Sequence, residues 1–325
     1  MLDPSSFRGV RLCVVGNLNR DLRVAPIAPG SYLFDDGETS AAFVRETPGG
    51  GAANSALFAA QLGAKVRLVA KVGDDESGRA LRRRIRGLGV HPFLAVDREH
   101  PTGTSINLVY TTGRRHFVSS LPSSAIESHE IDRAALRGVN YVLRADVWFS
   151  EPMLFGGNEK LLQSAKTSGA ATSLDLNWDP AWGKSPRGTV LARKRAVRNV
   201  LALVDLAHGN VRELCEFADA ATLRLALKRI TAWGAKAIIV HLGTRGSGYY
   251  REGRLARSPC VRAKRVVHST GTGDLLSVCM ILLHRHPAPV EEKLATANRI
   301  VSRYVAGETV LGTAVIAPSM RRASR

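Results

Sequence analysis

The residues with the clearest chemical potential form a glycine-rich turn that ends in an aspartate, Gly271-Thr272-Gly273-Asp274. The basic run 262–267 before it predicts a strand, and the apolar run 275–283 after it predicts a helix. Two glycines and a helix N-terminus direct N–H groups and partial positive charge at one point, which suits an oxyanion or a phosphate. A carboxylate there could take the proton from a hydroxyl that attacks phosphorus. The alternative is a plain turn with Asp274 as an ordinary residue of a helix start.

Polar side chains also follow the first predicted strand, the apolar run 11–16 that ends in glycine. Asn19 and Asp21 come directly after it. Ligands bind beyond the carboxyl ends of the strands in open α/β sheets, so both side chains could hydrogen bond to the hydroxyl groups of a sugar. The alternative is a turn in which they make Asx or capping bonds.

A glycine-rich segment, 48–56, opens a predicted helix that runs to Leu62. Its glycines would let a ligand approach the backbone, whereas the alternative is a flexible loop before a helix. Residues 22–47 and the β-prone runs 104–110 and 116–119 lack helical periodicity. They predict insertions in an α/β body that could pair into a small separate sheet.

The middle of the chain alternates strand and helix signals. We predict strands at 147–150 and 170–176, and a buried strand with a glycine turn over 237–248. Glu151 follows the first of these strands and could accept a hydrogen bond from a hydroxyl group, although acids in loops are usually inert. Asn210 with Glu213 three residues later fits a helix N-cap and its capping-box acid.

Composition predicts one large folded domain: the chain has 325 residues and is 45% hydrophobic. Its formal charge of +18 could signal nucleic acid, but aromatic residues make up only 6% and the basic residues are spread along the chain. The densest runs, 79–86 and 187–198, are typical of solvated faces of amphipathic helices. We therefore expect no specific nucleic-acid partner, only a positive field that attracts small anionic ligands.

No apolar run approaches the roughly 18 residues of a membrane span, and the first residues lack the pattern of a signal peptide. We expect a cytoplasmic protein with no membrane partner. The four cysteines are scattered without a CxxC pair, which favours reduced thiols over disulfides or a zinc site.

Ser269 to Asp274 resembles the C-terminal signature of the ribokinase-like (PfkB-type) carbohydrate kinases, and residues 48–78 resemble their N-terminal signature. Weaker resemblances lie at Asn210 to Glu213 and at the glycine turn after 241. The resemblance extends from about residue 11 to residue 314.

This resemblance implies a three-layer αβα sandwich with a mostly parallel central sheet and a small β-sheet lid. It implies a single kinase domain over residues 8–316, with lid segments at about 18–47 and 100–120 and a basic tail at 317–325. A homodimer formed through the lid is also expected.

The implied activity is transfer of the γ-phosphoryl group of ATP to a hydroxyl group of a sugar or sugar-like alcohol. Asp274 would be the base, and the amides of Gly271, Thr272 and Gly273 the anion hole. The expected acceptor residues are Asn19, Asp21, Gly50, Gly51, Asn54 and Glu151. The expected nucleotide residues are Asn210, His241, Gly243, Gly246 and Asn298. Glu213 would place Mg²⁺ through water, which suits an ion that keeps several waters.

Three departures from the family pattern carry consequences. His268 stands where the family usually has an aspartate that helps to bind a monovalent cation, so we expect such a cation to matter less here than in typical relatives. His241 replaces a common Thr or Lys and could be only a strand-end histidine. Trp178-Asp179 lacks the usual downstream arginine. These departures keep open a non-catalytic sugar- or nucleotide-binding regulator, whereas a nicotinamide dehydrogenase is disfavoured because no GxGxxG follows the first strand.

Overall fold

The computed structural model describes residues 2–112, 114–268 and 270–308, and its centre is a nine-stranded sheet. The strand order is β13-β12-β11-β10-β9-β8-β1-β4-β5, parallel from β11 to β5 and antiparallel at β12 and β13. The strands are β1 (Arg11–Val15), β4 (Lys65–Gly73), β5 (Val90–Asp97), β8 (Tyr141–Arg144), β9 (Ala171–Asp175), β10 (Leu206–Asn210), β11 (Ala237–His241), β12 (Ser247–Arg251) and β13 (Arg254–Ser258).

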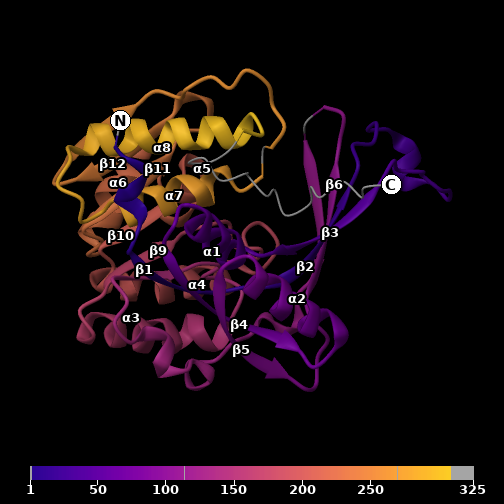
Figure 1. Cartoon of the computed structure of the whole chain (residues 1–325), viewed down its shortest axis with the longest axis horizontal. Coiled ribbons are helices and arrows are strands. Elements are labelled where there is room, and N and C mark those ends of the chain that lie inside the picture. The colour runs from indigo at the N-terminus through magenta and orange to yellow at the C-terminus, as the bar shows by residue number, and fades with distance from the viewer. Residues whose placement is uncertain (1, 113, 269, 309–325) are drawn as a thin grey trace.

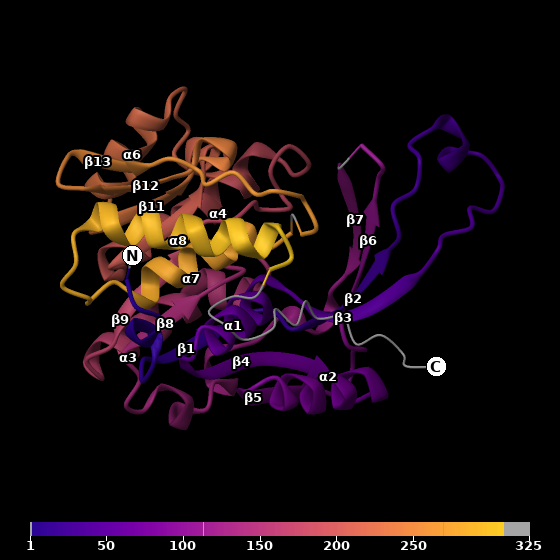
Figure 2. The same cartoon turned by 45° about the horizontal axis from the view of Figure 1, so that its top comes forward.

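Helices cover both faces of this sheet (Figures 1 and 2). One face buries apolar side chains of α1 (Gly51–Gln61), α2 (Glu76–Gly87), α7 (Thr272–Leu282) and α8 (Val290–Val305). The other buries those of α3 (Asn158–Thr167), α4 (Arg187–Val200), α5 (Val211–Phe217) and α6 (Leu223–Ala232). Parallel strands need such cover on both sides, and the predicted three-layer sandwich is confirmed.

A second sheet of four strands projects from the body beside α1 and α2 (Figure 2). Its order is β3-β2-β6-β7, and the strands are β2 (Asn19–Val24), β3 (Val44–Gly49), β6 (Thr104–Val109) and β7 (Arg115–Ser120). The two insertions predicted from sequence therefore pair with each other and form the small lid sheet. The proposed tail at 317–325 lies outside the described residues.

Two predicted strands are wrong. The first is the strand predicted at 147–150. The strand in this region is β8, which ends at Arg144, and residues 147–150 form a turn beyond it. Val147 and Trp148 are apolar because they pack in the core behind that turn, not because they pair with a strand. Residues 262–267 form no strand, and Val266 is 74% exposed.

The second basic run, residues 187–198 of α4, was predicted to be a solvated helix face, and this prediction is only partly right. Arg193 and Lys194 on α4 are 7% and 6% exposed. Arg193 binds the fully buried Asp179 with two hydrogen bonds, of 2.8 and 3.1 Å, and Lys194 lies 2.7 Å from Asp219. Paired in this way, buried cations are tolerated. The unusual Trp178-Asp179 sequence thus anchors α4.

No helix in residues 2–308 that the structure describes is both long enough and apolar enough to cross a membrane.

Candidate active site

Asp274 lies in the first turn of α7, the buried helix whose apolar sequence predicted it. Gly271 caps this helix in the left-handed conformation, with φ 78°, which favours glycine. A side chain at Gly271 would also come within 3.1 Å of the Phe58 ring. The N–H groups of Thr272, Gly273 and Asp274 open the helix and have no partner within it. The turn therefore has the geometry expected of an anion hole, and its role remains a prediction.

The first helix brings Asn54 to this aspartate. Asn54 Nδ2 donates to Asp274 Oδ2 at 3.3 Å, although the two residues are 220 positions apart. The glycine-rich start of α1 and the glycine-rich start of α7 therefore lie side by side, because α1 packs directly against α7. Burial, and next the charge of Asp146, raise the pKa of Asp274 to about 7. A carboxyl group with that pKa can exchange a proton near neutral pH.

A cavity of about 90 Å³ opens between this turn and the lid. It is lined by Asp21, Arg23, Thr47, Pro48, Asn54, Leu57, Phe58, Gln61, Asn107, His268, Thr270, Gly271 and Tyr304. Asp21 stands on β2, and Asn19 Nδ2 donates to its Oδ1 at 2.5 Å. Burial raises the pKa of Asp21 to about 7. Asn19 therefore orients Asp21, which faces the cavity.

The sequence analysis missed a buried carboxylate, Asp146, at the end of β8. Its Oδ2 accepts hydrogen bonds from Asn17 N at 3.0 Å and Ala52 N at 2.8 Å, and its Oδ1 accepts one from Gly51 N at 3.1 Å. Asp146 therefore caps α1 and holds it beside the first strand. Gly51 gives its N–H to Asp146, so contact of Gly51 with an acceptor stays a prediction. A signal was available: polar residues beyond the carboxyl ends of parallel strands mark the binding edge.

Gly50 has a structural reason to be glycine. Its φ is 97°, and a side chain there would come within 2.4 Å of the Asn17 carbonyl oxygen. Gly49 is similar, because a side chain would overlap the Asp21 carboxyl group. The glycine run thus lets β3 and α1 close around Asp21. Direct contact of Gly50 with a sugar is untested.

Of the predicted acceptor residues, Asp21 and Asn54 line the cavity, whereas Asn19, Gly50 and Gly51 lie behind the lining and Glu151 lies away from it. The Glu151 side chain is 72% exposed and its Oε1 lies 3.1 Å from Arg193 Nη1 on α4. The prediction assumed that a strand at 147–150 would carry Glu151 to the sheet edge. The strand ends earlier, so Asp146 stands at the edge instead.

Buried acids gather around Asp274. Burial first, and then the charges of Asp274, Glu213 and Asp146, raise the pKa of Asp175 well above its usual value. Burial also raises the pKa of Glu213. These carboxylates therefore disfavour one another's charge, and a cation bound nearby would relieve that repulsion.

Glu213 also completes the predicted capping box at the start of α5. Asn210 N donates to Glu213 Oε2 at 2.7 Å, and Glu213 N donates to Asn210 Oδ1 at 3.0 Å. Within the described residues, no three His, Cys, Asp or Glu side chains lie close enough to bind a metal directly. Placement of Mg²⁺ through water by Glu213 is compatible with this arrangement and remains a prediction.

The predicted nucleotide residues lie on the other side of the α7 turn. His241 ends β11, its Nε2 lies 2.7 Å from Ser277 Oγ, and its ring would meet a side chain at Gly273. Burial lowers the pKa of His241 to about 4, so the ring is neutral and packs beneath the turn. Gly246, with φ 99°, lets β12 approach the Ser258 carbonyl oxygen.

Two more of the predicted nucleotide residues, Gly243 and Asn298, have structural roles. Gly243 has φ 62°, which the turn after β11 requires. Asn298 Nδ2 donates to the carbonyl oxygens of Ser258 and Pro259, both at 3.0 Å. Asn298 therefore fixes the segment that follows β13. Contact of these residues with a nucleotide is untested.

His268 lies in the cavity wall, where its ring stacks on Tyr304 with centroids 5.2 Å apart. Burial and the nearby Arg23 lower the pKa of His268. We expect replacement of a bulky organic cation by K⁺ to change turnover little, because a neutral imidazole cannot supply an anionic ligand. His268→Asp should create or enlarge a K⁺ response. Turnover of both proteins in the two salts tests this, and a several-fold K⁺ gain in the wild type would contradict it.

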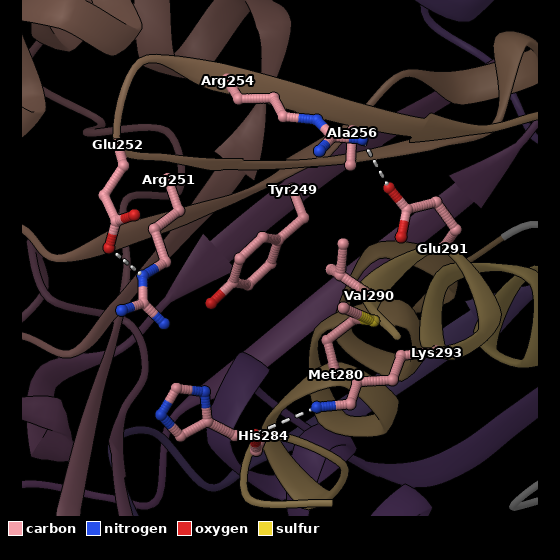
Figure 3. Close-up of a pocket in the computed structure, with 10 residues that line it drawn as sticks. All are labelled: Tyr249, Arg251, Glu252, Arg254, Ala256, Met280, His284, Val290, Glu291 and Lys293. Carbon is pink, nitrogen blue, oxygen red and sulfur yellow. Dashed lines mark hydrogen bonds and ion pairs between the residues drawn. The ribbon is translucent and has the colours of Figure 1, made fainter. Parts of the chain in front are cut away.

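A larger cavity, of about 490 Å³, lies between β12, β13, α7 and α8 (Figure 3). Met280 on α7 and His284, just after the end of that helix, line it. Its arginines are matched by acids: Arg251 with Glu252 at 2.9 Å, and Arg254 with Glu291 at 3.2 Å. This cavity is separate from the Asp274 site.

The covered sheet and its lid define the chain as a ribokinase-like α/β protein. A family model described as "pfkB family carbohydrate kinase" matches residues 11–305. The chain belongs to the pfkB family of carbohydrate kinases.

Relatives at low identity fit this assignment. The chain is 27% identical over 278 residues to the bifunctional protein HldE of Pseudomonas fluorescens, covering 84% of this chain but only 55% of that protein. It is 22% identical over 286 residues to the 5-dehydro-2-deoxygluconokinase of Lacticaseibacillus casei, covering 85% and 86%. The chain thus spans about half the length of HldE.

Solved structures show the same fold. The fructokinase of Xylella fastidiosa with bound ATP has a TM-score of 0.76 at 18% identity, covering 93% of this chain and 94% of that one. A putative ribokinase II of E. coli in complex with ATP and Mg²⁺ has a TM-score of 0.75 at 19% identity, covering 94% and 96%.

Proposed function

We propose that this protein is an ATP-dependent phosphotransferase that moves the γ-phosphoryl group to a hydroxyl group of a sugar or sugar-like alcohol. The observation that carries the proposal is Asp274, a carboxyl group with pKa about 7 at an open helix N-terminus, bound to Asn54 from the cavity wall. The family membership and the kinase relatives support the same reaction.

The chemistry follows from these positions. Asp21 holds hydroxyl groups of the acceptor, and Asn19 keeps its carboxyl group oriented. Asp274 takes the proton of the attacking hydroxyl, while the free N–H groups of the α7 turn stabilise charge on the transferred phosphoryl oxygens. Mg²⁺, when bound, neutralises phosphate charge, and Glu213 would hold it through water.

We expect ADP release to require Mg²⁺, ATP and a polyol together, because Mg²⁺ neutralises the phosphate charge and Asp274 needs a hydroxyl proton. A panel of sugars, sugar acids and nucleosides, with and without Mg²⁺, measures this. Calorimetric titration with ATP and NADH is the control. Tight binding of NADH without binding of ATP would contradict a kinase.

A non-catalytic regulator that kept the kinase fold is the alternative. It predicts binding of a sugar or nucleotide with no ADP release from any acceptor. The intact Asp274 and its turn argue against it.

The outer face of the lid supports a homodimer formed through it. Ile106 and Val118 pair across β6 and β7 on the face opposite the cavity, and they are 36% and 53% exposed. Apolar side chains on an exposed sheet face favour association.

A further inference from the structure

The cavity face of the lid presents its side chains in cross-strand rows. Asp21 on β2 pairs in register with Thr47 on β3 and Ser105 on β6, and this row carries one carboxyl group and two hydroxyl groups. Two residues further along β2, Arg23 pairs with Asn107 on β6. Side chains two residues apart share a face, and Asp21, Thr47, Arg23 and Asn107 all line the cavity.

The row formed by Arg23 and Asn107, called the outer row here, contains polar atoms without partners. Arg23 Nε and Asn107 Oδ1 are both buried, and within the described residues neither has a hydrogen bond partner. Asn107 is only 5% exposed. A buried donor such as Arg23 Nε and a buried acceptor such as Asn107 Oδ1 each lower the stability of the fold when unpaired, so a bound ligand that pairs with both is favoured.

A second guanidinium, that of Arg115 on the exposed strand β7, lies beside the cavity and is not one of its lining residues. Arg115 donates to the Thr270 hydroxyl, which lines the cavity, and it lies close enough to Arg23 for each charge to oppose the other. In the part of the chain that the structure describes, neither arginine has a carboxylate partner. The arginines of the larger cavity in Figure 3 do have such partners.

We propose that the acceptor is an anionic sugar, with a phosphate or carboxylate group bound by Arg23 and Arg115 and a separate hydroxyl group that reacts at Asp274. This inference rests on the proposed function. Two residues of strand place the anion roughly 7 Å from the hydroxyl contacts of Asp21, a length that a sugar chain spans. The unpartnered Asn107 Oδ1 would accept a hydrogen bond from a hydroxyl group of the same sugar.

Matched acceptors test the proposal on the wild-type protein. Fructose and fructose 6-phosphate, ribose and ribose 5-phosphate, and glucose and gluconate are compared by kcat/KM for ADP release. Two charge-assisted contacts predict a preference of at least about tenfold for an anionic member. Preference for phosphate over carboxylate, or the reverse, identifies the group. Equal or better use of every neutral member would overturn the inference and leave the kinase function standing.

Variants locate the anion. Arg23→Gln should lower the anionic-over-neutral ratio of kcat/KM by about 10-fold or more, and Arg23→Lys should restore part of it. The matched control is Arg20→Gln, which removes the same charge from the opposite face of β2, where Arg20 pairs with Glu46 at 2.7 Å. An unchanged ratio in Arg23→Gln, or the same drop in the control, would overturn the assignment.

Binding separates the two failures. If no acceptor supports ADP release, the proposed function is wrong, and calorimetric titration of the same pairs still decides the inference. Tighter binding of the anionic member would uphold an anion site, and equal binding would reject it.

Discussion

Asp274→Asn should lower kcat by at least about 10²-fold while the Kd for ATP stays nearly constant, because general-base catalysis typically contributes 10²–10⁴-fold. The amide has nearly the same shape and can still receive the bond from Asn54, but it cannot take the proton of the acceptor hydroxyl. The α7 turn stabilises charge through backbone N–H groups, which this substitution leaves in place.

The pH dependence of the wild type gives a second measurement of the same residue. Because the pKa of Asp274 is about 7 and the reaction needs the unprotonated form, kcat should rise with pH through about 7. The folded protein also binds this proton more tightly than the unfolded chain does. Stability therefore falls between about pH 4 and pH 7 as this group ionises, and Asp274→Asn should remove that loss and raise Tm at pH 8.

Measurement of kcat, ATP Kd and Tm on both proteins separates the possible roles. A plain helix-start aspartate predicts near-normal turnover in the variant. A regulator predicts no turnover in either protein. An active Asp274→Asn protein would refute the assignment of the base.

Asp21→Ala should raise the acceptor KM by about 10²-fold with little change in ATP Kd. Its carboxyl group lies between the hydroxyl groups of Thr47 and Ser105 in the lid sheet. Hydrogen bonds to a charged group contribute about 1.5–3 kcal/mol each. Asp21 lies on β2, on the lid side of the cavity, whereas the predicted nucleotide residues lie beyond the α7 turn.

Initial rates against acceptor concentration, with ATP saturating, measure this effect. Arg20→Ala, on the opposite face of the same strand, is the control for damage to the lid. An equal loss of ATP affinity in Asp21→Ala would show that Asp21 supports the fold and not the acceptor.

Local chemistry explains what the sequence could predict. The turn at 271–274 and the glycine run at 48–56 were located correctly because glycine and helix-start residues act within a few positions of themselves. The capping box at Asn210 and Glu213 is likewise a local pattern. The paired lid insertions were predicted from β-prone segments without helical periodicity in an otherwise α/β chain.

The placement of the strand near residue 147 depended on pairing with a neighbouring strand, which is not a local property of the sequence. Val147 and Trp148 have the composition of a strand, yet they are apolar because the core surrounds them. Composition reports burial, and only pairing with a neighbouring strand decides β structure. The error displaced Glu151 toward the site and concealed Asp146.

Only the tertiary structure decided which charges meet. Asp146 and Asp274 lie on different elements, and their shared burial, which shifts their pKa values, follows from the packing of α1 against α7. Arg23 and Arg115 converge because β6 lies between β2 and β7 in the lid. The sequence places these two residues far apart, whereas strand order brings both beside one cavity, and among the described residues neither has a carboxylate partner.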